Sequence, residues 1–526
     1  MNNRCALLVL GIALSAGLHA QAPAMAWEAF FNGSLPGEDE ARALIVAPDN
    51  TVYVTGSGTN IAPQGTISTL RYASDGTQLW ADHPYGPSQD SQNGGMDMAI
   101  DPWGHVFVCG NFSANAGDLC VVKYKPSGRI WRRNFEQYPT ADVPDEATGI
   151  AVDANGEVYV SGTITSTSGM GLESYILKVD SAGNELWHDA FSPSSADETA
   201  TDIAVSPGGN VFVGGGWWNV DGSSGIDLST ARYSTNGLAQ WKRGFSAVGM
   251  DDTALRIRTT VNDGVLAAGI ATIGSTPDAV VVARDASGAV LWSATHAGTG
   301  NVDDAAVDVR ELSDGRVAAA VHSRELVNGS LRHTVTTLLI DAGTVVWSRQ
   351  FTGDAGLGAW PTSMIVDAAD NIYIAGYAIV AGGATTDGLV LKYDVGGTLT
   401  WSIPYDGGAN SNDRFNAIAL NSAGDVVVCG TSHTSTTESR YVTVQFGNAV
   451  GVDEMMAEDR LAVFPNPAND RITITGIKPN APIEVFDALG GRVAIERAPS
   501  INVSTWADGI YFVKVEGIVQ RLVVQH

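Results

Sequence analysis

The sequence predicts an all-β protein: an eight-bladed β-propeller followed by a small C-terminal β-sandwich. Three observations support this prediction. Short strand-like stretches alternate with Gly- and Asn-containing turns, a tryptophan recurs at nearly even spacing, and the repeat breaks near residue 450. A seven-bladed propeller is the alternative if one of the weaker units is degenerate.

Residues 145–187 show the repeating unit most clearly. The segments GIAV, EVYVSG and YILKVD alternate apolar and polar residues or contain runs of β-branched residues, and the turns DANG and DSAGN separate them. Period-two patterning between such turns predicts antiparallel strands joined by hairpins. A single four-stranded sheet cannot bury both of its faces, so the recurrence of this unit determines the fold.

A tryptophan closes the fourth segment of each unit, at intervals of 51 to 56 residues. The series is Trp27, Trp80, Trp131, Trp187, Trp241, Trp292, Trp347 and Trp401. A four-stranded unit of nearly constant length is typical of a β-propeller. We expect each indole to fill the wedge between two blades, so that its replacement by Ala costs about 3–5 kcal/mol if the ring is fully buried.

The two ends of the repeat region predict how the ring closes. An eighth unit begins after Trp401 and ends with Arg440–Phe446, but no tryptophan follows it. The segment AWEAFFNG, which carries Trp27, can supply the missing strand. Pairing of the first strand with the last blade would leave no exposed sheet edge.

Aligning the units reveals a column that is mostly acidic, just ahead of the first strand of each unit. Its members are Asp39, Asn93, Asp145, Glu198, Asp252, Asp304, Ala359 and Asp413. In a closed propeller this column forms a ring near one mouth of the axial channel. The carboxylates could accept backbone N–H groups of the interblade turns, or they could form a rim that attracts cations such as Ca²⁺. No other cofactor is predicted.

Charge and the N-terminus limit the partners and the location of the protein. A net charge of −27 repels phosphate backbones and therefore argues against a nucleic-acid partner. Residues 1–20 resemble a secretory signal, with Arg4 ahead of an apolar run at 7–18 and a small-residue cleavage site. No later apolar run is long enough to span a membrane.

Cysteine usage leaves one question open. Cys109 and Cys120 fall on consecutive predicted strands, so either a cross-strand disulfide or two buried thiols would fit.

The C-terminal part differs from the repeat. We expect the propeller over 27–448, an acidic linker over 449–459 and a separate domain over 460–526. Alternating segments between Pro, Asn and Gly turns predict six or seven short strands in this last domain, as in a small β-sandwich.

Two resemblances to known families follow from these residues. VDANGEVYVSG at 152–162 and VDAADNIYIAG at 366–376 resemble the bacterial SBBP-type propeller repeat. This resemblance implies a propeller fold and says almost nothing of activity. The family label implies seven blades, whereas the tryptophan count predicts eight.

The C-terminal domain resembles the type A sorting domain of the type IX secretion system. The resemblance begins at Val463–Ala468, with Pro465, Asn466 and Pro467, and continues through Gly509 and Tyr511. It implies export through the type IX machinery of a Bacteroidetes-type bacterium. A sortase would then remove the domain near 449–459, and the propeller would be released or attached to the cell surface.

The sequence contains no recognisable catalytic motif. The clearest departure from the repeat is Trp217–Trp218 in GGGWWNVDGSSGID, where exposed indoles could stack on a sugar or another partner, or could instead cover their own loop.

We therefore expect a secreted or surface binding module with an unknown glycan or protein ligand. The alternative is a secreted hydrolase or lyase that acts on polysaccharide at the channel mouth. Perturbed carboxylates beside an arginine or histidine at the axis would favour the enzyme, and an aromatic loop face would favour the binding module.

Overall fold

The computed structural model contains two compact units, Met1–Asn448 and Ala449–His526, whose regular structure is β-strand throughout the described residues. The described residues are 22–447 and 462–526, without 62–63, 85–93, 113–117, 136–144, 167–170, 192–196, 219, 221–224, 246–251, 274–275, 300–301, 328, 354–355, 409–410, 476–480, 488–489 and 516–517. The predicted signal at 1–20 and the predicted linker at 449–459 lie outside them. No helix long and apolar enough to cross a membrane occurs in this part of the chain.

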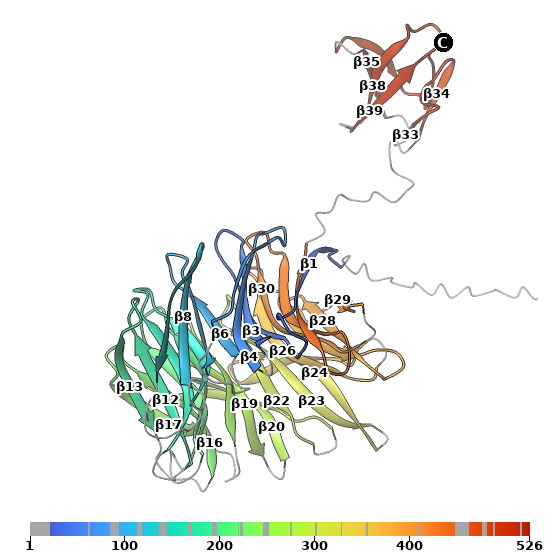
Figure 1. Cartoon of the computed structure of the whole chain (residues 1–526). Helices are drawn as coiled ribbons and strands as arrows, with labels where there is room; N and C mark the ends of the chain where they lie inside the picture. The colour runs from blue at the N-terminus through green and yellow to red at the C-terminus, as the bar shows by residue number, and fades with distance from the viewer. Residues whose placement is uncertain are drawn as a thin grey trace, which may run out of the picture. The chain divides into compact units, whose positions relative to one another are not determined.

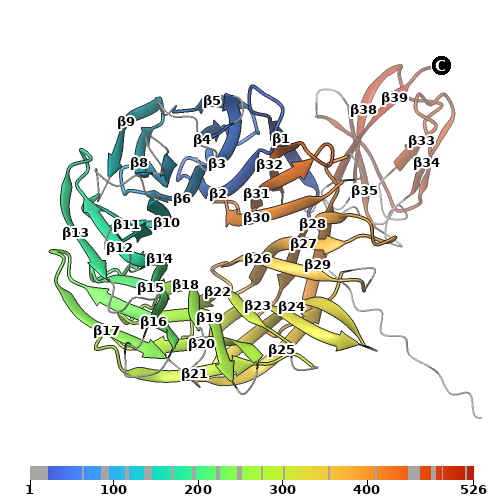
Figure 2. The ribbon, with the colours of Figure 1, turned by 60° about the horizontal axis from the view of Figure 1, so that its bottom comes forward.

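The first unit is a ring of eight four-stranded antiparallel sheets, here called blades (Figures 1 and 2). Blades 1 to 4 are β2–β5 (Glu40–Val46, Val52–Ile61, Gln64–Tyr72, Gln78–Asp82), β6–β9 (Gly94–Ile100, Val106–Phe112, Asp118–Lys125, Gly128–Phe135), β10–β13 (Asp145–Val152, Val158–Thr165, Leu172–Val179, Glu185–Phe191) and β14–β17 (Thr199–Val205, Val211–Trp218, Ile226–Tyr233, Ala239–Phe245). Blades 5 to 7 are β18–β21 (Thr253–Thr259, Val265–Ile273, Thr276–Arg284, Val290–His296), β22–β25 (Ala305–Glu311, Val317–Val327, Ser330–Asp341, Thr344–Phe351) and β26–β29 (Ala359–Val366, Ile372–Ile379, Thr386–Tyr393, Leu399–Tyr405).

Blade 8 closes the ring as the sequence predicts. It comprises β30 (Asp413–Leu420), β31 (Val426–His433), β32 (Ser439–Phe446) and, as its outermost strand, β1 (Met25–Phe31) from the N-terminus. β1 pairs antiparallel with β32, and the innermost strand β2 contacts both β6 and β30. The prediction of eight blades is confirmed, and the seven-bladed alternative is wrong.

The repeated tryptophans join neighbouring blades. The Trp187 indole N–H donates to the Thr235 carbonyl of the next blade over 3.0 Å. Its ring lies against Gly237, where φ is +86° and an added Cβ would come within 2.7 Å of the ring. Glycine is therefore required there both for the turn and for the close approach. The same indole-to-turn hydrogen bond is made by Trp27, Trp80, Trp131, Trp241 and Trp347.

The two faces of the propeller differ in regularity. One face, the turn face, carries the connections from first to second strand, which have the same length in all eight blades. The other face, the loop face, carries the connections between blades and those from second to third strand, and these vary in length. Every innermost strand begins at the loop face, so loops from all blades meet around the axis there.

Cys109 and Cys120 are buried free thiols, so the disulfide alternative is wrong. In the register of β7 and β8, Cys109 pairs with Val121 and Cys120 pairs with Gly110. Their side chains therefore point to opposite faces of blade 2, and they belong to different core clusters. Burial raises the pKa of the Cys120 thiol to about 12.

The second unit contains two small sheets. They are formed by β33 (Ala462–Phe464), β34 (Arg471–Thr475) and β37 (Ser500–Asn502), and by β36 (Arg492–Glu496), β35 (Ile483–Asp487), β38 (Gly509–Val515) and β39 (Ile518–Val524). Ile472, Ile483, Val513 and Leu522 lie in one buried core shared by both sheets.

Candidate functional site

The acidic column is buried at the loop face. Its six acidic members, Asp39, Asp145, Glu198, Asp252, Asp304 and Asp413, are between 0% and 3% exposed. Ala359 is buried as well, and Asn93 lies outside the described residues. Carboxylates this deeply buried do not present an open rim to solvent.

Several of these carboxylates fasten an interblade loop to its blade. The Gly298 N–H donates to Asp304 Oδ2, and the Arg324 N–H of β23 donates to Asp304 Oδ1 over 2.8 Å. Asp39 accepts the equivalent pair of backbone N–H groups, and Asp252 accepts the N–H of Thr272. Burial nevertheless raises the pKa of Asp39 and of Asp304, because the charged form loses its hydration.

The axial channel contains a second group of charges. Asp202 accepts hydrogen bonds from the Ile203 and Ile257 N–H groups, each over 2.9 Å. It also forms a salt bridge with Arg258 at 2.9 Å. Asp308 contacts Arg258 at 3.2 Å and Arg310 at 2.6 Å. The Val309 and Met364 backbone N–H groups also donate to Asp308.

Asp97 completes this axial group. It accepts the N–H groups of Met98 and Ile150, and burial together with the nearby Asp202 charge raises its pKa to about 6. Both oxygens of each of these three aspartates already accept a hydrogen bond. The axial carboxylates therefore tie blade 2 to 3, blade 4 to 5 and blade 6 to 7, and they offer little to a substrate.

The loop face departs from the repeat at blades 6 and 7, where Ala359 replaces the column acid. His322 of β23 and His333 of β24 are 2.9 Å apart between Nε2 and Nδ1. The His333 ring stacks on Trp360 at 4.4 Å, and Trp360 stacks on Tyr377 at 5.0 Å. All four rings are partly exposed, and Trp360 is the second residue of the innermost strand β26. We call His322, His333, Trp360 and Tyr377 the aromatic cluster.

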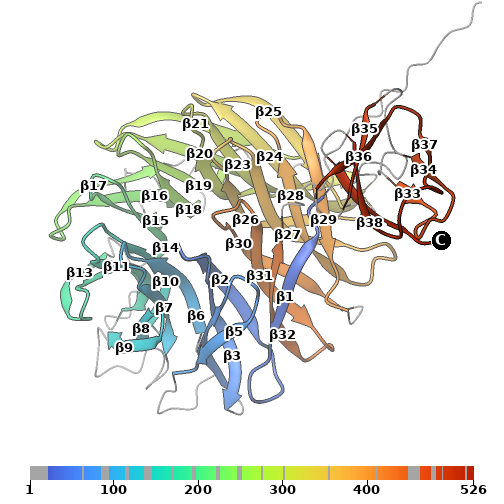
Figure 3. The ribbon, with the colours of Figure 1, turned by 90° about the horizontal axis from the view of Figure 1, so that it is seen from above.

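A cavity of about 400 Å³ is lined mainly by residues of blade 7. Its walls are mainly apolar and include Phe351, Ile379, Leu389 and Pro404, and Asp387 is a charged residue at its lining. Ile379 follows Tyr377 by two residues on β27, so the cavity and the cluster share one strand end. β26, β27, β28 and β30 can be followed side by side in Figure 3.

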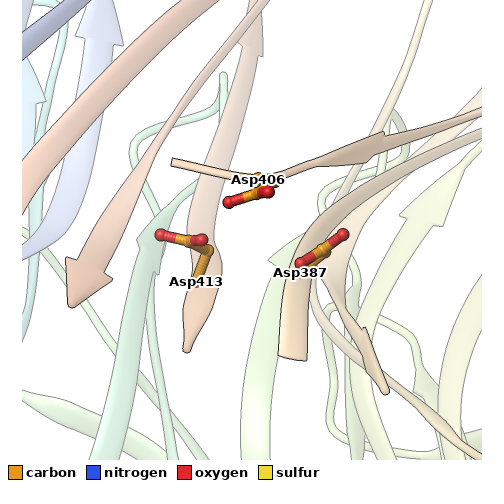
Figure 4. A group of neighbouring side chains, drawn as sticks. All are labelled: Asp387, Asp406 and Asp413. Atoms are coloured by element: carbon orange, nitrogen blue, oxygen red, sulfur yellow. The ribbon is translucent and has the colours of Figure 1, made fainter. Parts of the chain in front are cut away.

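Asp387 also belongs to an acidic triad with Asp406 and Asp413 (Figure 4). One carboxylate oxygen from each residue lies within 4.8 Å of the other two. Burial, then the charges of Asp406 and Asp413, raise the pKa of Asp387 to about 6. These are the described residues best able to hold a metal ion.

Trp217 and Trp218 differ in exposure, which decides between the two alternatives for Trp217. Trp217 is 1% exposed and its indole N–H donates to Ser174 Oγ over 2.6 Å. The expectation that it is available for ligand stacking is therefore wrong, because β15 extends through Gly214–Gly216 and turns Trp217 into the core. Trp218 is partly exposed at the loop-face end of the strand and stays a predicted contact.

The sorting-motif residues lie in the second unit. The Asn466 side-chain amide, between Pro465 and Pro467, donates to the Arg521 carbonyl, and its oxygen accepts the Val523 N–H over 2.8 Å. Gly509 begins β38, and the Tyr511 hydroxyl donates to the Ala507 carbonyl over 2.8 Å. The motif thus anchors the last strand and one turn of this domain.

Sequence reasoning missed the aromatic cluster and the triad. Trp360 stands outside the regular tryptophan series and directly follows Ala359, the column position without an acid or amide. That coincidence, with two histidines in the preceding blade, was the available signal. The triad had a weaker signal, because Asp387 stands 14 residues before Trp401, as Asp278 does before Trp292, and only Asp406 is exceptional.

Some solved structures resemble the chain at low similarity. They include a protein of unknown function from Bacteroides caccae (12% identity, 67% of this chain and 93% of that chain, TM-score 0.32). The WD40 domain of SCAP from fission yeast has 11% identity over 80% of this chain and 98% of that chain, with TM-score 0.41. PorZ, a surface component of the type IX secretion system of Porphyromonas gingivalis, has 12% identity over 92% of this chain and 81% of that chain, with TM-score 0.27. These values support no conclusion about a ligand.

Comparison with sequence families identifies the second unit. No curated protein matches the chain. Residues 462–525 match the secretion system C-terminal sorting domain family, in agreement with the motif at Pro465–Pro467. The C-terminal unit is therefore a type IX secretion sorting domain, and the chain is a β-propeller protein secreted to the cell surface or beyond it.

Proposed function

We propose that the exported propeller is a binding module whose ligand, a glycan or a protein, sits on the loop face across blades 6 to 8. The observation that carries this proposal is the aromatic cluster on the loop face of blades 6 and 7, and blade 7 also lines an apolar cavity of about 400 Å³. Partly exposed aromatic rings and a mainly apolar cavity with few polar groups are typical of ligand-binding surfaces.

The hydrolase or lyase alternative receives less support. Such an enzyme needs a carboxylate or imidazole that can reach a substrate proton. In the described part of the channel, Asp97, Asp202 and Asp308 are each bonded to backbone N–H groups. These hydrogen bonds join neighbouring blades and occupy the carboxylate oxygens that would have to reach a substrate proton.

We further propose the finer steps of export that the sequence implies. Residues 1–20 direct the chain across the inner membrane, and the sorting domain then passes it to the type IX machinery. A sortase cleaves within 449–459, and the propeller, whose repeats are of the SBBP type, is released or attached to the surface. Deletion of 460–526 should leave the propeller in the periplasm, and unchanged surface delivery would refute this route.

Binding is tested with the purified full-length protein on an array of glycans and soluble polysaccharides. Trp360→Ala and Tyr377→Ala should each weaken binding of a captured ligand about tenfold, which corresponds to roughly 1.4 kcal/mol. Trp103→Ala is the matched control, because Trp103 is 63% exposed in a turn-face loop of blade 2. Equal losses for Trp103 and Trp360 would contradict a loop-face site, and Trp218→Ala tests whether the site extends to blade 4.

A further inference from the structure

We propose that Asp387, Asp406 and Asp413 form a calcium site that joins blades 7 and 8. The proposal does not depend on the ligand of the loop face. The three residues come from separate segments: Asp387 lies on β28, Asp406 directly follows β29, and Asp413 begins β30. An ion held by all three would connect two blades at their interblade loop (Figure 4).

The spacing of the carboxylates fits a calcium ion. Their three nearest oxygens all lie within 4.8 Å of one another. Calcium binds oxygen at about 2.3–2.6 Å, so two oxygens on opposite sides of one ion are about 5 Å apart. All three ligands are hard oxygen donors, the kind that Ca²⁺ prefers over the nitrogen and sulfur ligands typical of zinc.

One oxygen of Asp413 is released from the bonding pattern that its equivalents follow. In Asp39, Asp252 and Asp304, one carboxylate oxygen accepts the N–H of the residue 20 positions later. At Asp413 the corresponding N–H, that of His433, donates instead to the Asn412 carbonyl over 2.9 Å. The other Asp413 oxygen, Oδ2, keeps its bond from the Gly407 N–H.

The released oxygen is buried. Asp413 is 1% exposed, and within the described residues no donor of normal geometry reaches Oδ1. Burial raises the Asp413 pKa, and the nearby Ser432 hydroxyl opposes that rise, yet this hydroxyl too is buried without a well-formed hydrogen bond. A buried carboxylate oxygen without a partner is costly, and a bound cation would supply the missing partner.

The triad also lacks a cationic side chain to balance it. Among the described residues, no lysine or arginine forms a salt bridge with Asp387, Asp406 or Asp413. Arg440 lies nearby, but its guanidinium donates to the Gly407 carbonyl and lies 3.4 Å from the centre of the Phe30 ring. Three carboxylates at this spacing repel one another unless a cation separates them.

The third carboxylate distinguishes this interface from the others. Asp406 stands seven positions before the column residue Asp413, whereas the same position holds Phe191, Phe245 and Ala297 before Glu198, Asp252 and Asp304. The released oxygen and the additional aspartate thus occur at the same interface. The unpaired Asp413 oxygen and the additional Asp406 carboxylate together support a cation site at the blade 7/8 interface.

The test is calorimetric titration of the full-length protein, treated with EDTA and then dialysed, with CaCl₂. We expect one site with a Kd of about 10⁻⁴–10⁻³ M, the range of extracellular calcium modules, and a melting temperature that rises with calcium. Asp406→Asn keeps the side-chain volume and should weaken binding at least tenfold. Asp278→Asn, at the interface of blades 5 and 6, is the matched control and should leave the Kd unchanged.

Three outcomes would overturn the proposal. Absence of heat together with an unchanged melting temperature would exclude a calcium site in this protein. Equal binding by the wild type and Asp406→Asn would place the ion elsewhere. Titration with MgCl₂ provides the last comparison, because equal affinity for Mg²⁺ would contradict the assignment to calcium.

Discussion

The interfaces of blades 5/6 and 7/8 start from the same residues and differ in what those residues do. Each has an aspartate on the third strand, Asp278 or Asp387, and a column aspartate, Asp304 or Asp413. Both oxygens of Asp304 accept backbone N–H groups. Asp413 retains one such bond, because the His433 N–H has turned to Asn412.

This difference shows how one repeat position can serve two purposes. Where backbone N–H groups donate to both carboxylate oxygens, the carboxylate holds the interblade loop against its blade. Where one backbone donor is redirected, the same carboxylate is left with an oxygen available to a cation. The two interfaces differ in the acceptor of one backbone N–H group, which is Asp304 for Arg324 and the Asn412 carbonyl for His433. The residue types in the column do not reveal this difference.

The largest expected effect concerns the two column aspartates themselves. Asp304→Ala should lower the free energy of unfolding by about 2–4 kcal/mol, because two backbone N–H groups lose their acceptor. Asp413→Ala in calcium-free buffer should cost about 1 kcal/mol or less, because it loses one such bond and relieves repulsion from Asp387 and Asp406. Chemical denaturation of both variants measures the difference, and equal losses would break the comparison.

Asp97 is a partly buried carboxylate of the axial group. Its pKa is raised to about 6 although it accepts two backbone N–H groups. A raised pKa means that the folded state holds its proton more tightly than the unfolded state. Stability from this group is therefore present below about pH 4 and is lost as the pH rises to about 6.

The variant Asp97→Asn should flatten this dependence. The slope of unfolding free energy against pH between 4 and 6 should change by up to about 1.4 kcal/mol per pH unit, the value for one proton. Denaturant titrations at several pH values provide the measurement. If the slope is the same in both proteins, Asp97 does not titrate in this range.

Substitution of a repeated tryptophan should have a smaller effect on stability. It compares a regular blade interface with the interface at which the ring closes. Trp187→Phe keeps most of the packing but removes the indole hydrogen bond to Thr235, at a cost of about 1 kcal/mol. At the closure, β1 replaces the hairpin onto which Trp401 would otherwise dock. Trp401 is 8% exposed and lies in a core cluster, so Trp401→Phe loses packing and should cost at least as much by thermal unfolding. A clearly smaller cost would show that the indole hydrogen bond is the larger contribution.

The smallest effect sharpens the comparison of the two interfaces. Ala297→Asp places a third carboxylate at the blade 5/6 interface on an exposed residue, so stability should change by less than about 0.5 kcal/mol. Because both Asp304 oxygens stay bonded to backbone, we expect no second calcium site in calorimetry. Appearance of one would show that the additional aspartate alone is sufficient.

The fold could be predicted from the sequence because its determinants repeat. Trp27 and the missing tryptophan after Trp401 predicted both the number of blades and the closing strand, and the structure confirms them. Among the repeated tryptophans, Trp241 and Trp401 are buried, whereas Trp187 is only partly buried. Its loss should therefore cost less than the 3–5 kcal/mol of a full core indole.

The candidate site was less predictable, because it consists of exceptions to the repeat. Gly214–Gly216 obscured the strand pattern of β15, so Trp217 was interpreted as part of an exposed loop. Asp387 and Asp406 lie 19 residues apart in sequence and meet only because β28 and β29 are neighbours. Such proximity depends on strand register, which the residue types do not specify.

A crystal structure of the secreted protein grown with CaCl₂ tests the central claim most directly. The account predicts an anomalous scatterer at about 2.3–2.6 Å from oxygens of Asp387, Asp406 and Asp413. It predicts none between Asp278 and Asp304. An ion-free triad with the Asp413 Oδ1 bonded to the His433 N–H would contradict the account, because the two interfaces would then be the same.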